Sequence, residues 1–124
     1  MNRNYNNGAR RERRIMKKLE KEGWFCIRSA GSHSPIDIIA IKPLTEYEKL
    51  LINKAEKLLI NKAEKDLDKM QKEAGETNII TLNENGSKIV VKFIQSKKTG
   101  YLTPQERAEK QKLEQRLGIN IEVM

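Results

Sequence analysis

Apolar residues recur along the chain with two different periods, and the changes between them mark the expected helices and strands. Residues 1–7 are rich in Asn and are expected to be loose. From Gly8 to Glu22 the apolar positions are three or four residues apart, which predicts a helix that Gly23 ends. The core-facing positions of this helix are Ile15, Met16 and Leu19.

Two short apolar runs follow and predict strands, at Trp24–Arg28 and at Pro35–Ile41. Residues 31–34 form the loop between them, and Pro43 closes the second strand. A long helical pattern then covers residues 44–74. Its apolar positions are Leu51, Ala55, Leu58, Leu59, Ala63, Leu67 and Met70.

An octapeptide repeat lies within this helical pattern, since residues 49–56 recur as residues 57–64. Eight residues advance a helix by about 80° beyond two full turns, so the two copies do not present one straight seam. We interpret the repeat as a duplication that lengthens an insertion over residues 44–83. Two roles are compatible with it: packing on its own domain, or contact with a partner helix or a second copy.

The following segment predicts a β-hairpin. Asn78–Leu82 and Lys88–Ile94 are rich in β-forming residues, and Asn85-Gly86 between them is a strong hairpin-turn signal.

A capping box opens the last expected helix, with Thr103 as the N-cap, Pro104 at the first position and Glu106 three residues after the cap. This helix runs to Leu117, Gly118 ends it, and Ile119–Val123 is a short terminal strand. The elements together predict a single α/β domain over residues 1–124, a small mixed β-sheet flanked by helices.

Charge is concentrated at the N-terminus. The chain has 124 residues, a net charge of +8 and a pI near 9.6, which favours a polyanionic partner. Residues 1–28 hold nine Lys and Arg against three acids. A local positive patch is expected of a protein that binds a phosphate backbone. A solvated basic helix is the alternative.

Cysteine and histidine usage excludes several classes of site. A single Cys26 excludes an internal disulfide and a cysteine zinc cluster, and a single His33 excludes a histidine-pair metal site. No apolar run has membrane-spanning length, and the N-terminus is polar rather than signal-like. We expect a soluble, intracellular protein of the cytoplasm without a membrane segment.

Candidate chemistry lies at the ends of two expected strands. Asp37 begins one apolar run, and the other ends with Gln95 and Lys97, which face together because they are two residues apart on a strand. Glu12 lies on the inward edge of the first helix. An acid facing an amide and a lysine is the layout of a metal-dependent phosphodiesterase. Without that chemistry, Asp37 would cap a strand, Lys97 would be surface charge and Glu12 would pair with an arginine.

Several motifs resemble the archaeal-type Holliday junction resolvases, which belong to the PD-(D/E)xK or restriction-endonuclease-like nuclease superfamily. The motifs are Gly8-Ala9-Arg10-Arg11-Glu12-Arg13, Leu19, Gly23-Trp24, Arg28-Ser29-Ala30-Gly31-Ser32 and Asp37-Ile38-Ile39-Ala40. The resemblance is close over residues 5–42 and looser over 88–117. It implies a restriction-endonuclease-like core with a helical insertion, and a homodimer that binds four-way DNA junctions in recombination and repair and cuts them with Mg²⁺ (or Mn²⁺).

The resemblance also implies roles for individual residues. The catalytic set would be Glu12, Ser32, Asp37, Gln95 and Lys97, and the metal ligands would be Glu12, Asp37, Gln95 and the Ser96 carbonyl. The DNA-binding set would be Arg10, Arg11, Arg13, Arg14, Lys17, Arg28, His33 and Lys98. Gln95 would stand where the family usually has Glu, which removes one negative charge from the metal site.

Three functions are therefore compatible with the sequence. The first is a structure-selective endonuclease that resolves four-way junctions. The second is a catalytically weak or inactive dimeric protein that binds branched DNA. The third is a restriction- or repair-type nuclease on the same fold.

Overall fold

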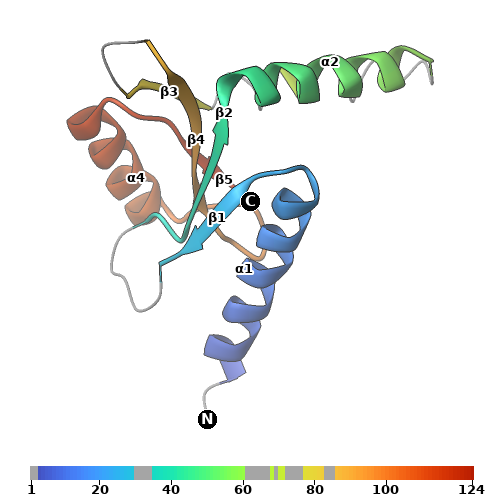
Figure 1. The fold of residues 1–124 in the computed structure, drawn as a ribbon. Helices are drawn as coiled ribbons and strands as arrows, with labels where there is room; N and C mark the ends of the chain where they lie inside the picture. The colour runs from blue at the N-terminus through green and yellow to red at the C-terminus, as the bar shows by residue number, and fades with distance from the viewer. Residues whose placement is uncertain (1–2, 30–34, 61–67, 69, 72–76, 83–85) are drawn as a thin grey trace.

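The structure, a computed structural model, describes residues 3–29, 35–60, 68, 70–71, 77–82 and 86–124. Its elements are α1 (Arg3–Lys21), β1 (Phe25–Arg28), β2 (Ile38–Pro43), α2 (Leu44–Ile60), β3 (Asn78–Thr81), β4 (Lys88–Gln95), α4 (Pro104–Leu117) and β5 (Ile121–Val123). The predicted mixed sheet flanked by helices is confirmed (Figure 1).

Strand β4 is the centre of the sheet. One edge of β4 pairs with β2, which in turn pairs with β1, and all of these pairings are antiparallel. On the other edge, β3 pairs with the first half of β4 in antiparallel register and β5 pairs with its second half in parallel register. Asn78 joins the two short strands, because its amide donates to the Asn120 carbonyl and accepts from the Asn120 N–H.

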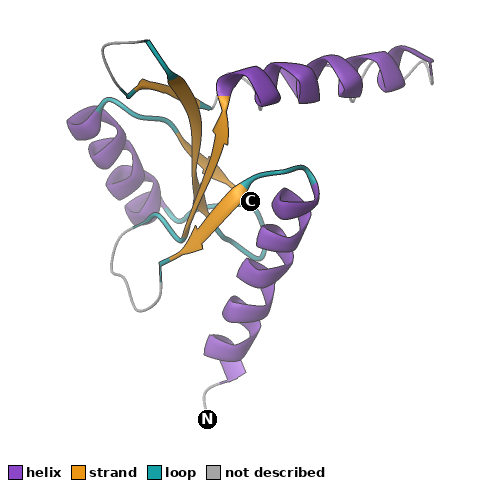
Figure 2. Cartoon of the chain, viewed as in Figure 1, coloured by secondary structure: helices purple, strands orange, loops and turns teal. Residues whose placement is uncertain are grey.

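Helix α1 lies on one side of the sheet and α4 on the other (Figure 2). The buried side chains of Ile15 and Leu19 on α1 form one core cluster with Ile38 and Ala40 of β2 and Ile94 of β4. The apolar spacing predicted for the first helix therefore does cover the sheet. Burial of these side chains supplies the main favourable free energy of folding on this side.

Trp24 anchors α2 to the same side of the sheet. Its ring meets the Tyr47 ring edge-on, with centroids 5.4 Å apart. The ammonium groups of Lys42 and Lys92 lie 5.7 and 5.5 Å from the centroid of the indole, within cation–π range. Lys92 is buried and donates to Glu122 at 3.3 Å, so its charge is compensated across the β4–β5 pair.

Several predicted boundaries were wrong. The helix begins at Arg3, so residues 3–7 are not loose; no proline interrupts them, and Gly8 is accommodated inside the helix. Strand β2 begins at Ile38 rather than Pro35. Before the ladder starts, the Asp37 N–H donates to the Ile94 carbonyl of β4, but the Asp37 side chain rather than its backbone accepts from the Ser96 N–H, just after β4. Strand β4 extends to Gln95 because Gln95 still pairs with Val123.

The local signals of the C-terminal third were correct. Thr103 and Glu106 form the predicted capping box, and Gly118 ends α4 with φ of 68°, a left-handed conformation that suits glycine. β3 and β4 form the predicted antiparallel hairpin. The predicted turn at residues 83–85 and most of the helical pattern beyond Ile60 lie outside the described residues.

We expect Ile94→Ala to lower the free energy of unfolding by about 2–5 kcal/mol, because it opens a cavity at a fully buried position of the central strand. Ile79→Ala is the matched control, since Ile79 on β3 is 59% exposed, and it should cost less than about 1 kcal/mol. Urea denaturation followed by circular dichroism measures both. Equal losses would mean that the core is not centred on β4.

Candidate active site

Asp37 is fixed at the junction of three strands. Its N–H donates to the Ile94 carbonyl at 2.8 Å, and its carbonyl accepts from the Ser29 N–H at 2.8 Å. The Asp37 carboxylate accepts a third hydrogen bond, from the Ser96 N–H at 2.8 Å. The Asp37 side chain, which is predicted to be the main metal ligand, therefore lies against the backbone of Ser96, the residue that follows Gln95 at the end of β4.

The electrostatic surroundings of Asp37 disfavour its charge. Burial raises the pKa of the Asp37 carboxyl above its ordinary value, and the hydrogen bond from Ser96 is the largest influence that lowers it. The Glu12 carboxylate raises the pKa further, whereas the positive charges of Lys97 and Arg11 lower it. The structure thus places Glu12 and Lys97 each within electrostatic reach of Asp37.

Glu12 points inward from α1 and forms an ion pair with Arg28 of β1. Both side chains are mostly shielded, with 15% and 23% exposure. A guanidinium holds a carboxylate in a fixed orientation, so this pair orients Glu12 across the gap between helix and sheet. The sequence allowed Glu12 to be either a site acid or the partner of an arginine, and the structure gives it an arginine partner close to Asp37.

Lys97 follows β4 and pairs with Glu106 in the first turn of α4. The hydrogen bond from Lys97 is the largest influence that lowers the pKa of Glu106, followed by the bond from the Thr103 N–H. The backbone of Lys97 is held separately, because its N–H donates to the Met124 carbonyl at 2.8 Å. Both the backbone and the ammonium of Lys97 are therefore tied to segments far from β4 in the sequence.

Gln95 and Ser96 are buried, with 7% and 9% exposure. Within the described residues, neither Gln95 Oε1 nor Ser96 Oγ has a hydrogen-bond partner. Since β4 ends at Gln95, strand alternation does not extend to Lys97, and the expected common face of Gln95 and Lys97 is untested. A buried amide oxygen without a donor is energetically costly, and it is suited to accept from a group that the protein itself does not supply.

The donor set suits a hard divalent cation better than a zinc-type one. No three His, Cys, Asp or Glu side chains form a group that could hold a metal ion in the part of the chain that the structure describes. The oxygens near the end of β4 are the Asp37 carboxylate and the unpartnered amide oxygen of Gln95. Mg²⁺ takes one or two carboxylates, keeps several waters and completes its shell with substrate phosphate, so these residues fit it.

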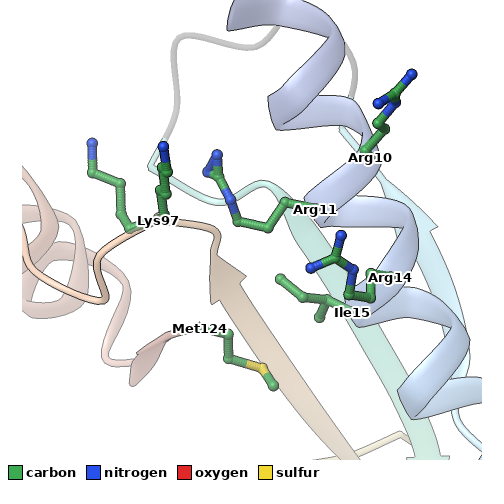
Figure 3. Close-up of a pocket in the computed structure, with 7 residues that line it drawn as sticks. Arg10, Arg11, Arg14, Ile15, Lys97 and Met124 are labelled. Atoms are coloured by element: carbon green, nitrogen blue, oxygen red, sulfur yellow. The ribbon is translucent and has the colours of Figure 1, made fainter.

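A basic pocket of about 500 Å³ opens beside these residues (Figure 3). Its lining residues are Arg10, Arg11, Arg14, Ile15, Lys97, Lys98 and Met124. Arg11 extends from α1 toward Lys97, whereas Arg10 points away from the sheet. Five cationic side chains from α1 and from the loop after β4 thus line one pocket, which is the charge pattern that a phosphate backbone requires.

The other predicted DNA-binding residues divide into three groups. Arg13 and Lys17 are exposed on α1 but do not line the pocket. Arg28 pairs with Glu12. Ser32 and His33 lie outside the described residues.

Sequence reasoning missed two residues at this site. Glu106 was predicted only as part of a capping box, and nothing local to its motif indicates that it also binds Lys97. Met124 lines the pocket and exchanges backbone hydrogen bonds with Gln95 and Lys97. The parallel register of β5 brings it there, and short-range sequence patterns do not encode that register.

Comparison with known families gives a match. A family model described as archaeal Holliday junction resolvase (hjc) matches residues 3–122, which is nearly the whole chain. No curated protein and no solved structure matches the chain significantly. None of the described helices is long and apolar enough to cross a membrane.

We expect Asp37→Asn to be more stable than the wild type at pH 8. The raised pKa of Asp37 means that ionisation is disfavoured in the folded state, and the Asn amide oxygen still accepts from the Ser96 N–H without carrying charge. The advantage should vanish as the pH falls through the raised pKa toward the ordinary value of about 3.9, because Asp37 then becomes neutral as well.

Urea denaturation from pH 8 to pH 4 measures this difference. Asp68→Asn is the matched control, because Asp68 is exposed and undergoes the same change of charge. A wild type that is more stable than Asp37→Asn at pH 8 would contradict the prediction.

Proposed function

Since the chain belongs to the archaeal Holliday junction resolvase family, we propose that it is a metal-dependent endonuclease that resolves four-way DNA junctions by phosphodiester hydrolysis. The reaction would take place inside the cell, where recombination and repair produce such junctions. The observation that carries the proposal is the position of Asp37: a carboxylate with a raised pKa, close to Lys97 and beside a basic pocket. Perturbed carboxylates in charged clefts are typical of catalytic sites.

The basic pocket supports the binding half of the function. Arg10, Arg11 and Arg14 come from consecutive turns of α1, and Lys97 and Lys98 from the loop after β4. A DNA backbone in this pocket would place a phosphate near Lys97 and therefore near Asp37. Arg13 and Lys17, exposed on the same helix, extend the positive surface for the flanking phosphates.

The hydrolytic step would use the protein's residues as follows. Asp37 and the Gln95 amide oxygen would orient the reacting groups at the end of β4, with Glu12 held at their side by Arg28. Lys97 would donate a hydrogen bond to the scissile phosphate or the attacking water and would stabilise the negative charge that develops. Ser32, five residues before Asp37 in the sequence, would contact the same phosphate.

Mg²⁺ or Mn²⁺ would be held by Asp37, Gln95, Glu12 and the Ser96 carbonyl. When bound, the cation supplies Lewis acid activation of water and phosphate. The raised pKa of Asp37 and the unpartnered Gln95 oxygen support this assignment, since both features favour a cation at the end of β4. Gln95 contributes no charge, so the DNA phosphate would complete the charge balance of the site.

A binding-only protein explains the same features less well. Junction binding requires the basic pocket, but it does not require a partly buried carboxylate next to a second carboxylate. Such clustering costs stability, and a protein that only binds DNA gains nothing from it.

A second copy of the chain would complete the enzyme, because four-way junctions are cut in two strands. The face of β1 and β2 away from α1 carries an apolar patch, which consists of Phe25, Ile27, Ile39 and Ile41. Phe25 and Ile27 are 66% and 47% exposed, and they pair across the strands with Ile41 and Ile39. An exposed apolar patch on a sheet suits a two-fold interface.

The decisive experiment incubates an end-labelled four-way junction, and a linear duplex of matched sequence, with the protein and Mg²⁺. We expect cutting of the junction, its loss in a chelator, and little cutting of the duplex. Asp37→Asn should lower the cleavage rate about 100-fold or more while the dissociation constant for the junction changes less than about threefold.

Asp68→Asn is again the control and should cut like the wild type. Junction binding without cutting by the wild type would establish the binding-only alternative. Equal cutting of junction and duplex would instead establish a restriction- or repair-type nuclease.

We expect Phe25→Asp to convert a dimer into a monomer, because it places a charge at the most exposed side chain of the apolar patch. Light scattering at micromolar concentration measures the mass, and junction cutting should fall with it. Ile79→Asp is the control, since Ile79 is also an exposed apolar side chain but lies on β3, on the other face of the sheet. Dimers of both variants would show that the interface lies elsewhere.

A further inference from the structure

We propose that Glu106 is a positioning residue that holds the Lys97 ammonium at the active site. This inference rests on the proposed nuclease function and adds to it a residue from α4, on the opposite side of the sheet from α1. The observation that carries it is the ion pair between Lys97 Nζ and Glu106 Oε2.

Lys97 needs such a restraint because of where it lies. It follows the last residue of β4, so no ladder neighbours flank its side chain. The backbone hydrogen bond from its N–H to the Met124 carbonyl fixes the main chain only. A lysine side chain has four rotatable bonds and loses considerable conformational entropy when its ammonium is placed, so an unpaired Lys97 would sample many positions.

Glu106 is well suited to supply the restraint because its own side chain is fixed. Its Oε1 accepts from the Thr103 N–H at 3.1 Å, and its N–H donates to Thr103 Oγ1 at 3.2 Å. The capping box thus locks the carboxylate at the start of α4, and Oε2 remains for Lys97. One oxygen caps the helix and the other binds the lysine.

The pairing leaves Lys97 able to act. An ammonium has three N–H donors, and Glu106 occupies one of them. The others remain available to a phosphate in the basic pocket, which Lys97 lines. Lys97 also attracts the carboxylate of Asp37, the residue that directly precedes β2. Glu106 therefore fixes the direction from which Lys97 reaches the reacting phosphate.

The capping role and the positioning role of Glu106 can be separated by two substitutions. Glu106→Gln keeps a side-chain oxygen for the Thr103 N–H but removes the charge that holds Lys97. Thr103→Ala removes the hydroxyl of the capping box but keeps the charge on Glu106. Glu109→Gln makes the same change of charge on the exposed surface of α4 and serves as the control.

The experiment measures single-turnover junction cleavage, junction affinity and thermal stability for all three variants. We expect Glu106→Gln to cut about tenfold more slowly, with junction affinity within about twofold of the wild type. Thr103→Ala should instead lower the melting temperature by several degrees and cut at nearly the wild-type rate. Glu109→Gln should match the wild type in every measurement.

A second readout does not depend on cutting. Acetylation of Lys97 relative to the neighbouring exposed Lys98, measured by peptide mass spectrometry, should rise about two- to fivefold in Glu106→Gln, as expected when a partly exposed ion pair is lost. Unchanged cleavage together with an unchanged acetylation ratio would overturn the proposal. Faster cutting by Glu106→Gln would overturn it as well, because Glu106 would then compete with DNA for Lys97.

Failure of the proposed function would be seen separately. A wild type that cuts no branched DNA overturns the nuclease assignment, and the acetylation ratio still decides whether Glu106 holds Lys97.

Discussion

The structure of the site depends on the three hydrogen bonds of Asp37. Its N–H and carbonyl bind Ile94 and Ser29, and its carboxylate binds the Ser96 N–H. A partly buried carboxylate that accepts from the backbone cannot turn away without leaving that N–H unsatisfied, which costs about 1–3 kcal/mol. The side chain is therefore held in one orientation although burial disfavours its charge. Each group proposed to act with Asp37 is placed relative to this one residue.

Charges around Asp37 are matched in pairs drawn from different elements. Glu12 of α1 pairs with Arg28 of β1, and Lys97 pairs with Glu106 of α4. The Glu12–Arg28 pair is mostly shielded, so removing one member leaves the other unpaired in low dielectric, and the pair locks α1 to β1. Lys97 lines the basic pocket, and Arg11, which directly precedes Glu12 in α1, reaches toward Lys97. The two pairs supply Glu12 and Lys97 with counter-ions, and the arginines of α1 supply the positive charge of the pocket.

The sequence predicted what short-range patterns encode. The capping box of Thr103, the hairpin of β3 and β4 and the inward direction of Glu12 all follow from residue spacing. The pairing of Lys97 with Glu106 and the position of Met124 were not predicted, because both depend on where α4 and β5 lie relative to β4. The predicted start of α1 was wrong. Asparagine is a weak helix former, which favoured a loose segment over residues 3–7, but the structure includes these residues in the helix. Long-range register, rather than local propensity, completes this site.

The parallel pairing of β5 with β4 has a consequence for how the protein is made. Residues 95–97 exchange backbone hydrogen bonds with Met124, about thirty positions later in the chain. A ribosome that is still synthesising β5 has already released α1 with its arginines, which can bind nucleic acid by charge alone. The segment bearing Gln95 and Lys97 cannot yet adopt its final conformation at that stage. Nascent chains would thus hold a nucleic-acid-binding surface before they hold an ordered nuclease site, and cutting would be confined to chains whose last strand has been translated.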